Sequence, residues 1–420
     1  MEMTDRVYLS LRSGERNLQG NIPAFAFSGI FRPARHGDRR TLRDRFKGAL
    51  SHPRGDLSLE HVVRDARNLL ILCDDGTRPT PTAETLELMV PVIERAGLPA
   101  EKIRILFATG THRALSEQEA HAKIGTDLWG RISWESHDCE GPLTHVGWTS
   151  AGTPVEVNPR LAEADLVIGI GSVFPHRYCG WSGGGKLVLP GVSGQRSILR
   201  SHMMPYYDPS ICLGSPKNLA ISESREAARI AGLRFLVQIV CDGTGKVYAV
   251  EAGEPGLAHD AAIARGQEVF SARIDPADIV IASAWPEDSD LWQAGKALYA
   301  AEMAVKKGGL IVLVADLREG IGPHPEYAPL LRLGSNAIRS GMETGRFKDP
   351  LAAAAALVTR RVMEKARIIL VTSEAGSNVA REALLNWNSN FQETLNMVLD
   401  QRPEGRLVLL EEAPLILPLS

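Results

Sequence analysis

Short runs of Val, Ile and Leu recur along this chain, and longer stretches in which apolar residues repeat every three to four positions separate them. Short apolar runs are typical of strands buried on both faces, whereas the longer repeats are typical of amphipathic helices. The apolar runs lie at residues 69–73, 103–108, 166–171, 235–241, 278–283, 310–315 and 368–373. Strands and helices that alternate in this way predict an α/β fold with mainly parallel sheets.

Helical periodicity fills the stretches between these runs. The apolar residues of the segment 84–97 fall on one helical face, at Leu86, Met89, Val90 and Ile93. Pro276 precedes a new strand after the helix expected at residues 258–270, which indicates a change of domain near this point. A chain of 420 residues exceeds what one hydrophobic core usually supports, so we expect two domains.

Composition and charge exclude several classes of partner. The formal net charge is -3, with acids and bases mixed along the chain, so no basic surface is expected for nucleic acid or anionic lipid. The five cysteines are scattered and form no C-x-x-C pair, which predicts neither a disulfide framework nor a thiolate zinc site. Residues 1–16 lack a basic and then apolar leader, and no apolar run is long enough for a membrane span. We therefore expect a soluble, cytoplasmic protein.

The segment 180–187 reads GWSGGGKL and is close to the phosphate-binding loop of nucleoside triphosphatases. That loop requires a serine or threonine after the lysine, a strand directly before the glycines and a helix directly after them. Here Leu187 follows Lys186, and Pro190 with Gly191 would interrupt a helix in its first turn. A nucleotide-dependent enzyme therefore stays only as an alternative. The three glycines still predict a close approach of the backbone to a bulky group.

Charged side chains gather directly after three of the predicted strands. Asp75 and Arg78 follow the first strand, His112 follows the second, and His176 and Lys186 follow the third. Each residue alone has a structural explanation, such as an ion pair in a turn or a helix cap. Because ligands bind at the carboxyl ends of parallel strands, the whole set favours a site.

The chemistry of these residues suits a small hydroxy acid. Arg78 offers a planar fork for a carboxylate. His112 and His176 belong to the residue type that titrates near neutrality, so the two side chains are candidates for an acid and a base on opposite faces of a substrate. The run GIGSVF lacks the third glycine and the helix of a dinucleotide site, so the residues themselves identify no electron acceptor.

Four segments in succession resemble the signatures of the nickel-dependent lactate racemase family: DDGTRPTPT, ATGTHR, PHRYCGWSGGGKLVLPGV and the SH of RSILRSH. Their order and spacing are closely similar to those of the family, and four motifs are far more specific than one glycine loop. The resemblance implies a nickel-pincer nucleotide, which is a pyridinium-3-thioamide-5-thiocarboxylic acid mononucleotide that carries nickel. It also implies that Lys186 holds this cofactor covalently through a thioamide.

The resemblance implies roles for further residues. His202 would supply the nickel ligand of the protein, although from the residues alone it is a histidine at a helix end. A protein metal site usually shows three or four clustered ligands, so one histidine does not indicate a metal. The residues that would contact the cofactor besides Lys186 are Ser182, Gly183, Gly184, Thr109 and Thr111.

The activity implied by the resemblance is racemisation or epimerisation at C2 of a 2-hydroxy acid, by reversible hydride transfer to the pyridinium ring. His112 and His176 would be the catalytic acid and base. The substrate would contact Asp75, Arg78, Gln293 and Lys296. The last two come from the shorter match LWQAGKALYAAEM, and a solvated helix face is the alternative for Lys296. A ligand-binding protein without catalytic activity is the other alternative for the chain.

The resemblance further implies two α/β domains with the active site in the cleft between them. Residues 1–272 would form the N-terminal cofactor-binding domain, possibly completed by residues 404–420, and residues 275–400 would form the C-terminal domain. The aromatic candidates for the substrate pocket are Trp292, Trp181 and Tyr178. Lactate, malate, an aromatic lactate and a sugar acid share the reacting fragment, so the residues do not select among them. The oligomeric state stays open, a homodimer included.

Overall fold

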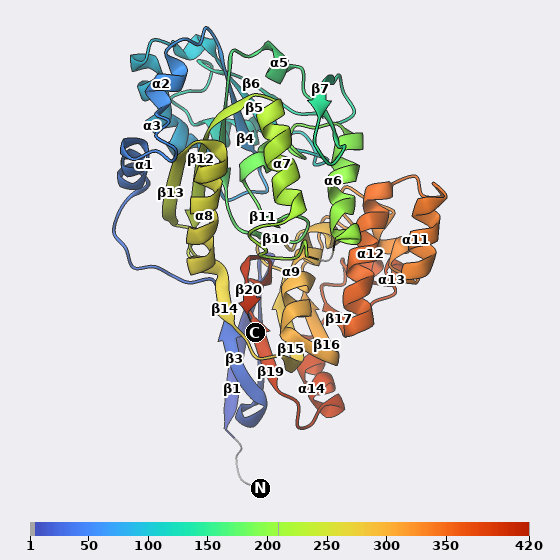
Figure 1. The fold of residues 1–420 in the computed structure, drawn as a ribbon. Helices are drawn as coiled ribbons and strands as arrows, with labels where there is room; N and C mark the ends of the chain where they lie inside the picture. Colours follow the sequence, from blue (N-terminus) through green and yellow to red (C-terminus); the bar gives the residue numbers. More distant parts are fainter. Residues whose placement is uncertain (1–4, 209, 420) are drawn as a thin grey trace. The chain divides into compact units, whose positions relative to one another are not determined.

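The computed structural model describes residues 5–208 and 210–419 of the chain (Figure 1). Contacts within it divide the chain into two compact units. The first unit is Ala34–Val269, and the second unit combines the segment up to Pro33 with the segment from Phe270 onwards. The chain therefore starts in the second unit, builds the whole first unit and then returns.

The first unit contains a six-stranded sheet in the order β13-β12-β9-β4-β5-β6. Its strands are β4 (Leu69–Asp74), β5 (Ile103–Ala108), β6 (Ser133–Ser136), β9 (Leu166–Ser172), β12 (Leu233–Cys241) and β13 (Val247–Gly253). Neighbouring strands are parallel, except that β13 is antiparallel to β12. Two short antiparallel pairs lie in the connections: β7 (Thr144–Trp148) with β8 (Pro154–Val157), and β10 (Pro175–His176) with β11 (Gly180–Trp181).

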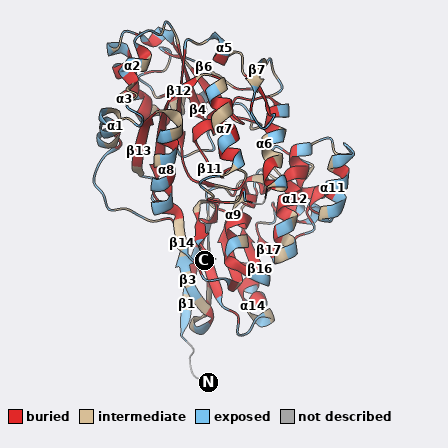
Figure 2. Ribbon diagram, viewed as in Figure 1, coloured by how far each residue is buried: buried red, intermediate tan, exposed pale blue. Residues whose placement is uncertain are grey.

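Both faces of this sheet are buried. Side chains alternate between the two faces along each strand, so each face carries its own core cluster. In β4, Leu69, Ile71 and Cys73 belong to one core cluster, whereas Leu70 and Leu72 belong to another. Figure 2 shows the strands buried and the helices exposed on their outer sides. The helices and 3-10 turns of this unit are α1 (Leu42–Ser51), α2 (Leu59–Val63), α3 (Thr82–Arg95), η2 (Ala100–Lys102), α4 (Glu117–Ile124), α5 (Arg160–Glu163), η3 (Gly184–Leu187), α6 (Gln195–Tyr207), α7 (Leu219–Ile230) and α8 (Pro255–Phe270).

The second unit contains another six-stranded sheet, in the order β18-β17-β16-β15-β19-β3, and all of its neighbours are parallel. These strands are β3 (Phe27–Phe31), β15 (Ala277–Ser283), β16 (Val305–Val314), β17 (Arg367–Val371), β18 (Asn386–Asn388) and β19 (Leu407–Leu410). Two further pairs are β1 (Arg6–Ser13) with β2 (Arg16–Pro23) and β14 (Ser271–Arg273) with β20 (Leu417–Leu419). Its helices and turns are η1 (Ala24–Ala26), α9 (Leu291–Ala304), α10 (Tyr327–Leu330), α11 (Ser335–Glu343), α12 (Pro350–Lys365), α13 (Ser377–Glu382), α14 (Phe391–Gln401) and η4 (Ala413–Leu415).

The structure confirms the α/β class with mainly parallel sheets, and all seven strands predicted from apolar runs are present. The predicted helix at residues 84–97 corresponds to α3, and the one at residues 258–270 corresponds to α8. Among the described residues, no helix is both long and apolar enough to cross a bilayer.

The two units differ from the expected domains at both ends of the chain. The expected N-terminal domain began at residue 1, but β3 pairs with β19 and so lies in the second unit. Residues 404–420 were considered as a return to the N-terminal domain, yet β19 lies between β15 and β3 in the sheet of the second unit. The physical reason is strand pairing, because β3 and β19 complete the edge of a parallel sheet whose other strands come from the C-terminal part.

Candidate active site

Three neighbouring strands of the first unit bring the predicted site residues to one edge of the sheet. The strands β9, β4 and β5 are adjacent and parallel, so their carboxyl ends meet. Asp75 and Arg78 follow β4, His112 follows β5, and the segment with His176 and Lys186 follows β9. This edge is where open parallel sheets bind their ligands.

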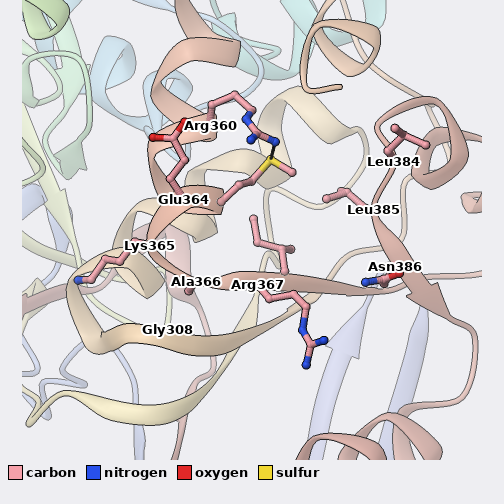
Figure 3. A pocket seen from close by; sticks show the side chains of 11 residues that line it. Gly308, Arg360, Glu364, Lys365, Ala366, Arg367, Leu384, Leu385 and Asn386 are labelled. Carbon is pink, nitrogen blue, oxygen red and sulfur yellow. Dashed lines mark hydrogen bonds between the residues drawn. The ribbon is translucent and has the colours of Figure 1, made fainter. Parts of the chain in front are cut away.

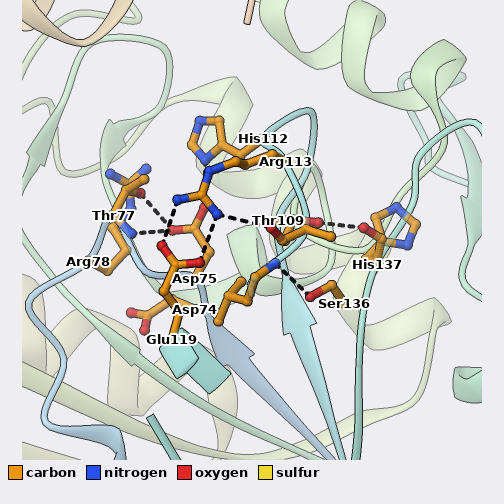
Figure 4. A network of polar contacts seen from close by, with 12 residues as sticks. Asp74, Asp75, Thr77, Arg78, Thr109, His112, Arg113, Glu119, Ser136 and His137 are labelled. Carbon is orange, nitrogen blue, oxygen red and sulfur yellow. Dashed lines mark hydrogen bonds and ion pairs between the residues drawn. The ribbon is translucent and has the colours of Figure 1, made fainter. Parts of the chain in front are cut away.

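His112 is held by a buried carboxylate. Its Nδ1 lies 2.6 Å from Asp75 Oδ2, and the Thr77 backbone N–H and hydroxyl donate to Asp75 Oδ1 (Figure 4). Asp75 is 4 % exposed, whereas the side chain of His112 is 22 % exposed. Burial alone would raise the pKa of Asp75, but the contacts with His112, Arg78 and Thr77 outweigh it and hold the pKa below its usual range.

This carboxylate fixes the tautomer of the histidine. Ionised Asp75 can only accept hydrogen bonds, so Nδ1 of His112 carries the proton and Nε2 carries the lone pair. Because the pKa of Asp75 in the folded protein lies below that in the unfolded chain, its contribution to stability is complete above about pH 4 and is lost as the pH falls further. Asp75 therefore keeps its negative charge between about pH 5 and 8.

Arg78 lies in the same loop, which buried polar contacts hold in place. Its guanidinium carbon is 5.2 Å from the centre of the Phe174 ring, and its carbonyl oxygen accepts from Lys123 Nζ at 3.0 Å. Asp74 accepts hydrogen bonds from the Thr80 hydroxyl and, at 3.0 Å, from the Ser172 backbone N–H. These contacts join the end of β4 to the end of β9.

A second group of aromatic rings connects His176 to His202. The ring centre of Tyr178 is 6.1 Å from that of His176 and 5.1 Å from that of His202. The Tyr178 backbone N–H donates to His176 Nδ1 at 3.3 Å, which places the proton of a neutral His176 on Nε2. His202 lies on α6, and its Nδ1 is 3.0 Å from the Ile198 carbonyl oxygen. A carbonyl only accepts, so Nε2 of His202 carries the lone pair, which is the state of a metal-binding histidine.

The glycine loop is packed against protein atoms. A Cβ on Gly183 would lie 2.2 Å from Gln238 Oε1, one on Gly184 would lie 2.3 Å from His259 Nδ1, and one on Gly185 would lie 2.2 Å from the Ser224 carbonyl oxygen. The three glycines predicted a close approach of the backbone to a bulky group. On the side where a Cβ would lie, the structure places atoms of the protein itself there. A ligand could therefore contact these glycines only through their backbone.

The same loop does not have the form of a triphosphatase loop. Gly184–Leu187 forms only the 3-10 turn η3, and the next helix, α6, begins at Gln195. Lys186 is partly exposed, whereas its neighbours on both sides are buried. The helix N-terminus that would receive a triphosphate is therefore not placed at Lys186, which disfavours the nucleotide-dependent alternative.

Two of the hydroxyl groups predicted to contact a cofactor make hydrogen bonds within the protein. Ser182 Oγ accepts from the Phe174 backbone N–H and donates to the Ser172 carbonyl oxygen, both at 2.9 Å. Thr109 Oγ1 donates to the His137 carbonyl oxygen at 2.7 Å. Thr111 is partly buried, directly before His112. Ser182 and Thr109 therefore stabilise the loops that carry the candidate site.

In the second unit, α9 carries Gln293 and Lys296. Gln293 is only 6 % exposed, and its side-chain Oε1 has no hydrogen-bond partner among the residues that the structure describes. Lys296 Nζ lies 2.6 Å from Glu287 Oε2, and its side chain is 22 % exposed. Lys296 therefore forms an ion pair instead of lying on a solvated helix face, and Gln293 offers a buried acceptor for a ligand.

The aromatic pocket candidates lie in different surroundings. Trp181 is fully buried and donates its Nε1–H to the Gly214 carbonyl oxygen at 2.9 Å, so its ring packs inside the first unit. The ring of Trp292 lies 4.1 Å from that of His324, centre to centre. Tyr178 lies near the two histidines of its own unit, as described above.

The described part of the chain shows no further metal site, and the hollow seen in Figure 3 lies away from these strand ends. No group of three or more His, Cys, Asp or Glu side chains that could hold a metal exists within the described part of the chain. Figure 3 shows a hollow whose lining includes Gly308, Lys365, Arg367 and Asn386. It lies where β17 and β18 begin, and therefore not at the carboxyl edge of the sheet.

Sequence reasoning missed three polar residues that hold these loops: Lys123, Gln238 and His259. Gln238 offered a signal, because a glutamine within the apolar run FLVQIVC is a buried polar group that needs partners. Lys123 and His259 offered none, since each lies on a helix among other charged residues.

The chain is similar to known proteins over most of its length. The family model described as "Lactate racemase N-terminal domain" matches residues 13–214, and the one described as "Lactate racemase C-terminal domain" matches residues 272–410. The chain is 32 % identical over 322 residues to the lactate racemase of Thermoanaerobacterium thermosaccharolyticum, which covers 75 % of each chain. It is 27 % identical over 408 residues to the lactate racemase of Lactiplantibacillus plantarum, which covers 94 % of each chain.

Solved structures give the same result. The lactate racemase apoprotein from Thermoanaerobacterium thermosaccharolyticum superposes with a TM-score of 0.90 at 26 % identity, over 99 % of this chain and 100 % of that one. A protein from Thermotoga maritima shares the fold, with a TM-score of 0.70 at 20 % identity over 90 % of this chain and 98 % of that one. The two domain models together with a 32 % identical relative show that this chain belongs to the lactate racemase family.

Proposed function

We propose that this chain is an isomerase that inverts the C2 centre of lactate or of a closely related 2-hydroxy acid. The observation that carries the proposal is the pair of histidine-bearing loops at one sheet edge, with His112 fixed by Asp75 so that Nε2 is the basic atom. Both matched relatives are named lactate racemase. The family models match both an N-terminal and a C-terminal domain, so the chain has both domains of the family.

In this proposal His112 takes the proton of the substrate hydroxyl. Its Nε2 has the lone pair, and the ionised Asp75 stabilises the imidazolium that forms. His176 acts on the same oxygen from the other side. Its neutral form donates from Nε2, so it becomes a base only after its proton moves to Nδ1, which breaks the 3.3 Å contact with the Tyr178 N–H. The two histidines are therefore not equivalent, although both exchange a proton with the substrate.

The substrate carboxylate would be bound by cations. Arg78 supplies the guanidinium in the first unit, held by Phe174 and by the loop of Asp75. Lys296 of the second unit is the further cation, and the buried Oε1 of Gln293 is an acceptor for a donor group elsewhere on the substrate.

The residues present fit the nickel-pincer nucleotide of the family. His202 Nε2 is in the ligand state, and Lys186 offers a partly exposed amine on an otherwise buried loop. Attachment at Lys186 would hold the nucleotide, and His202 would bind its nickel. When bound, this group supplies an acceptor that takes the Cα hydrogen as a hydride and gives it back.

The test is the fate of the Cα hydrogen. A single enantiomer of lactate, incubated in heavy water with protein from cells that make the cofactor, should convert to an even mixture with almost no deuterium at Cα. A hydride returned within one cycle never meets bulk water, whereas a proton on a histidine exchanges with solvent. Mass spectrometry of the product measures the label. Full labelling would reject hydride transfer, and absence of inversion with every 2-hydroxy acid tried would reject the isomerase.

A second prediction concerns the carboxylate behind His112. Asp75→Asn should lower kcat about a hundredfold or more in both directions, because the amide does not stabilise an imidazolium and no longer fixes the tautomer. Initial rates by chiral chromatography measure the loss. Asp165→Asn is the matched control, since the Asp165 carboxylate contacts Arg67 and Asn68 and lies directly before the start of β9, away from the strand ends that carry His112, and it should keep the wild-type rate. An Asp75→Asn protein within about threefold of wild type would contradict this role.

A further inference from the structure

Two fully buried polar side chains lie directly behind the glycine loop. The first is His259 on α8, which is 1 % exposed. Its Nε2 lies 3.0 Å from the Ser182 carbonyl oxygen, and its Nδ1 lies 3.2 Å from Arg225 Nη2. A guanidinium only donates, so Nδ1 accepts and Nε2–H donates to Ser182. Burial, together with the neighbouring Arg225, lowers the pKa of His259 to about 4, so the ring is neutral at neutral pH.

The second side chain is Gln238 in β12, which is completely buried. Its Oε1 accepts the Gly184 backbone N–H at 2.6 Å, and its Nε2 donates to the Gly171 carbonyl oxygen at 3.2 Å. Gln238 therefore ties the glycine loop to the end of β9. His259 and Gln238 therefore form hydrogen bonds with the backbone of the two residues that flank Gly183, which are Ser182 and Gly184.

The same two side chains also limit where the loop can move. Gln238 Oε1 occupies the space of a Cβ on Gly183, and the His259 ring occupies that of a Cβ on Gly184. Gly183 and Gly184 have φ of 77° and 59°, the left-handed region that favours glycine. Burial of an imidazole or an amide costs free energy unless its polar atoms are hydrogen-bonded. Here each side chain directs one of its hydrogen bonds to the residues just before Lys186, at Ser182 and Gly184.

We propose that His259 and Gln238 are positioning residues, which hold the glycine loop in the one conformation that presents the Lys186 amine for attachment of the cofactor. The proposal rests on the proposed function, since attachment at Lys186 is part of that function. Both side chains act on the backbone, so neither is a catalytic residue. All the residues involved belong to the first unit.

The experiment makes two measurements on each variant. Hydrogen exchange of the peptide that covers residues 180–189 is followed in protein made without the cofactor. Intact mass spectrometry follows how fast Lys186 gains the adduct in cells that make the cofactor. His259→Leu fills the space without a donor, Gln238→Leu removes the contact with Gly184, and His259→Gln keeps an N–H near the position of Nε2.

We expect His259→Leu and Gln238→Leu each to speed exchange in this peptide about tenfold and to slow adduct formation about tenfold, the effect of one lost buried hydrogen bond. His259→Gln should stay within about twofold of wild type. The control is His324→Leu, which replaces a buried histidine of the second unit and should change neither measurement. If His259→Leu does not fold, Gln238→Leu and His259→Gln still decide the question.

Wild-type exchange and wild-type loading in both leucine variants would overturn the proposal. Faster exchange with unchanged loading would also overturn it, because the contacts would then serve only the stability of the loop. If the wild type itself gains no adduct on Lys186, the proposed function fails along with the part of the proposal that concerns attachment. The exchange measurement on the apoprotein would still show whether the two side chains hold the loop.

Discussion

Lys186→Ala is expected to abolish both covalent attachment of the cofactor and racemase activity, while the protein stays folded. The side chain is partly exposed at the end of a buried loop, so its loss removes little packing. Joining the lysine Nζ to a thiocarboxylic carbon of the free cofactor releases one water, so the wild-type peptide should gain the cofactor mass less that of water. Peptide mass spectrometry measures the adduct, and chiral chromatography measures the rate.

Lys186→Arg makes this test specific. Arginine keeps the positive charge and the length of the side chain, but its guanidinium stays protonated and does not act as the amine nucleophile. Lys186→Arg should therefore be as inactive and as free of adduct as Lys186→Ala. Lys246→Ala, which changes a lysine in the turn between β12 and β13, should load and turn over like wild type. An adduct of the same mass in Lys186→Ala protein would refute the assignment.

The second large effect separates metal binding from proton transfer. His202→Ala should lose nickel, because it removes the Nε2 lone pair that would bind the metal. The Ile198 carbonyl oxygen accepts from Nδ1–H and so keeps this lone pair on Nε2. His112→Ala and His176→Ala should keep nickel but lose about a hundredfold to ten-thousandfold in kcat, the range of general acid and base groups. Metal content per chain and initial rates in both directions are the measurements. The three variants are matched, since each changes one histidine to alanine.

Two outcomes would contradict these assignments. Full nickel content in His202→Ala would show that another group holds the metal. A His112→Ala or His176→Ala protein with a near wild-type rate in both directions would show that one histidine is enough. The distinction matters because the contacts of the two catalytic histidines differ, with a carboxylate on His112 and a backbone N–H on His176.

The sequence predicted the centres of both sheets well and their edges poorly. Strands such as β4 are buried on both faces, so every position is apolar and the run is visible in the sequence. The edge strand β3 reads FSGIF and has exposed positions, and β10 and β11 have two residues each. Such short strands are defined by their partners. No local pattern indicates that Phe27–Phe31 pairs with Leu407–Leu410.

The candidate site was predictable as a set of residues but not as a set of contacts. Strand ends and motif resemblance identified His112, His176 and Lys186. A glycine in a sequence shows only that a side chain is absent; whether a Cβ would clash there, and with which atom, is known from the structure alone. For Gly184 that atom belongs to His259, which lies 75 positions further along the chain. The ion pair between Lys296 and Glu287 likewise depends on how the chain folds before α9.

The pairing of β3 with β19 has a consequence for how the chain is completed during synthesis. Phe27–Phe31 leaves the ribosome before the whole of Ala34–Val269, yet its partner Leu407–Leu410 emerges only after that unit. Ala34–Val269 is by then fully synthesised and has its own core. Domains generally fold as units while translation proceeds, and distant strand pairs form slowly. The nascent chain therefore holds β3 without its partner strand until β19 has emerged, so a chain cut short before β19 would lose the pairing of β3 as well as the missing residues.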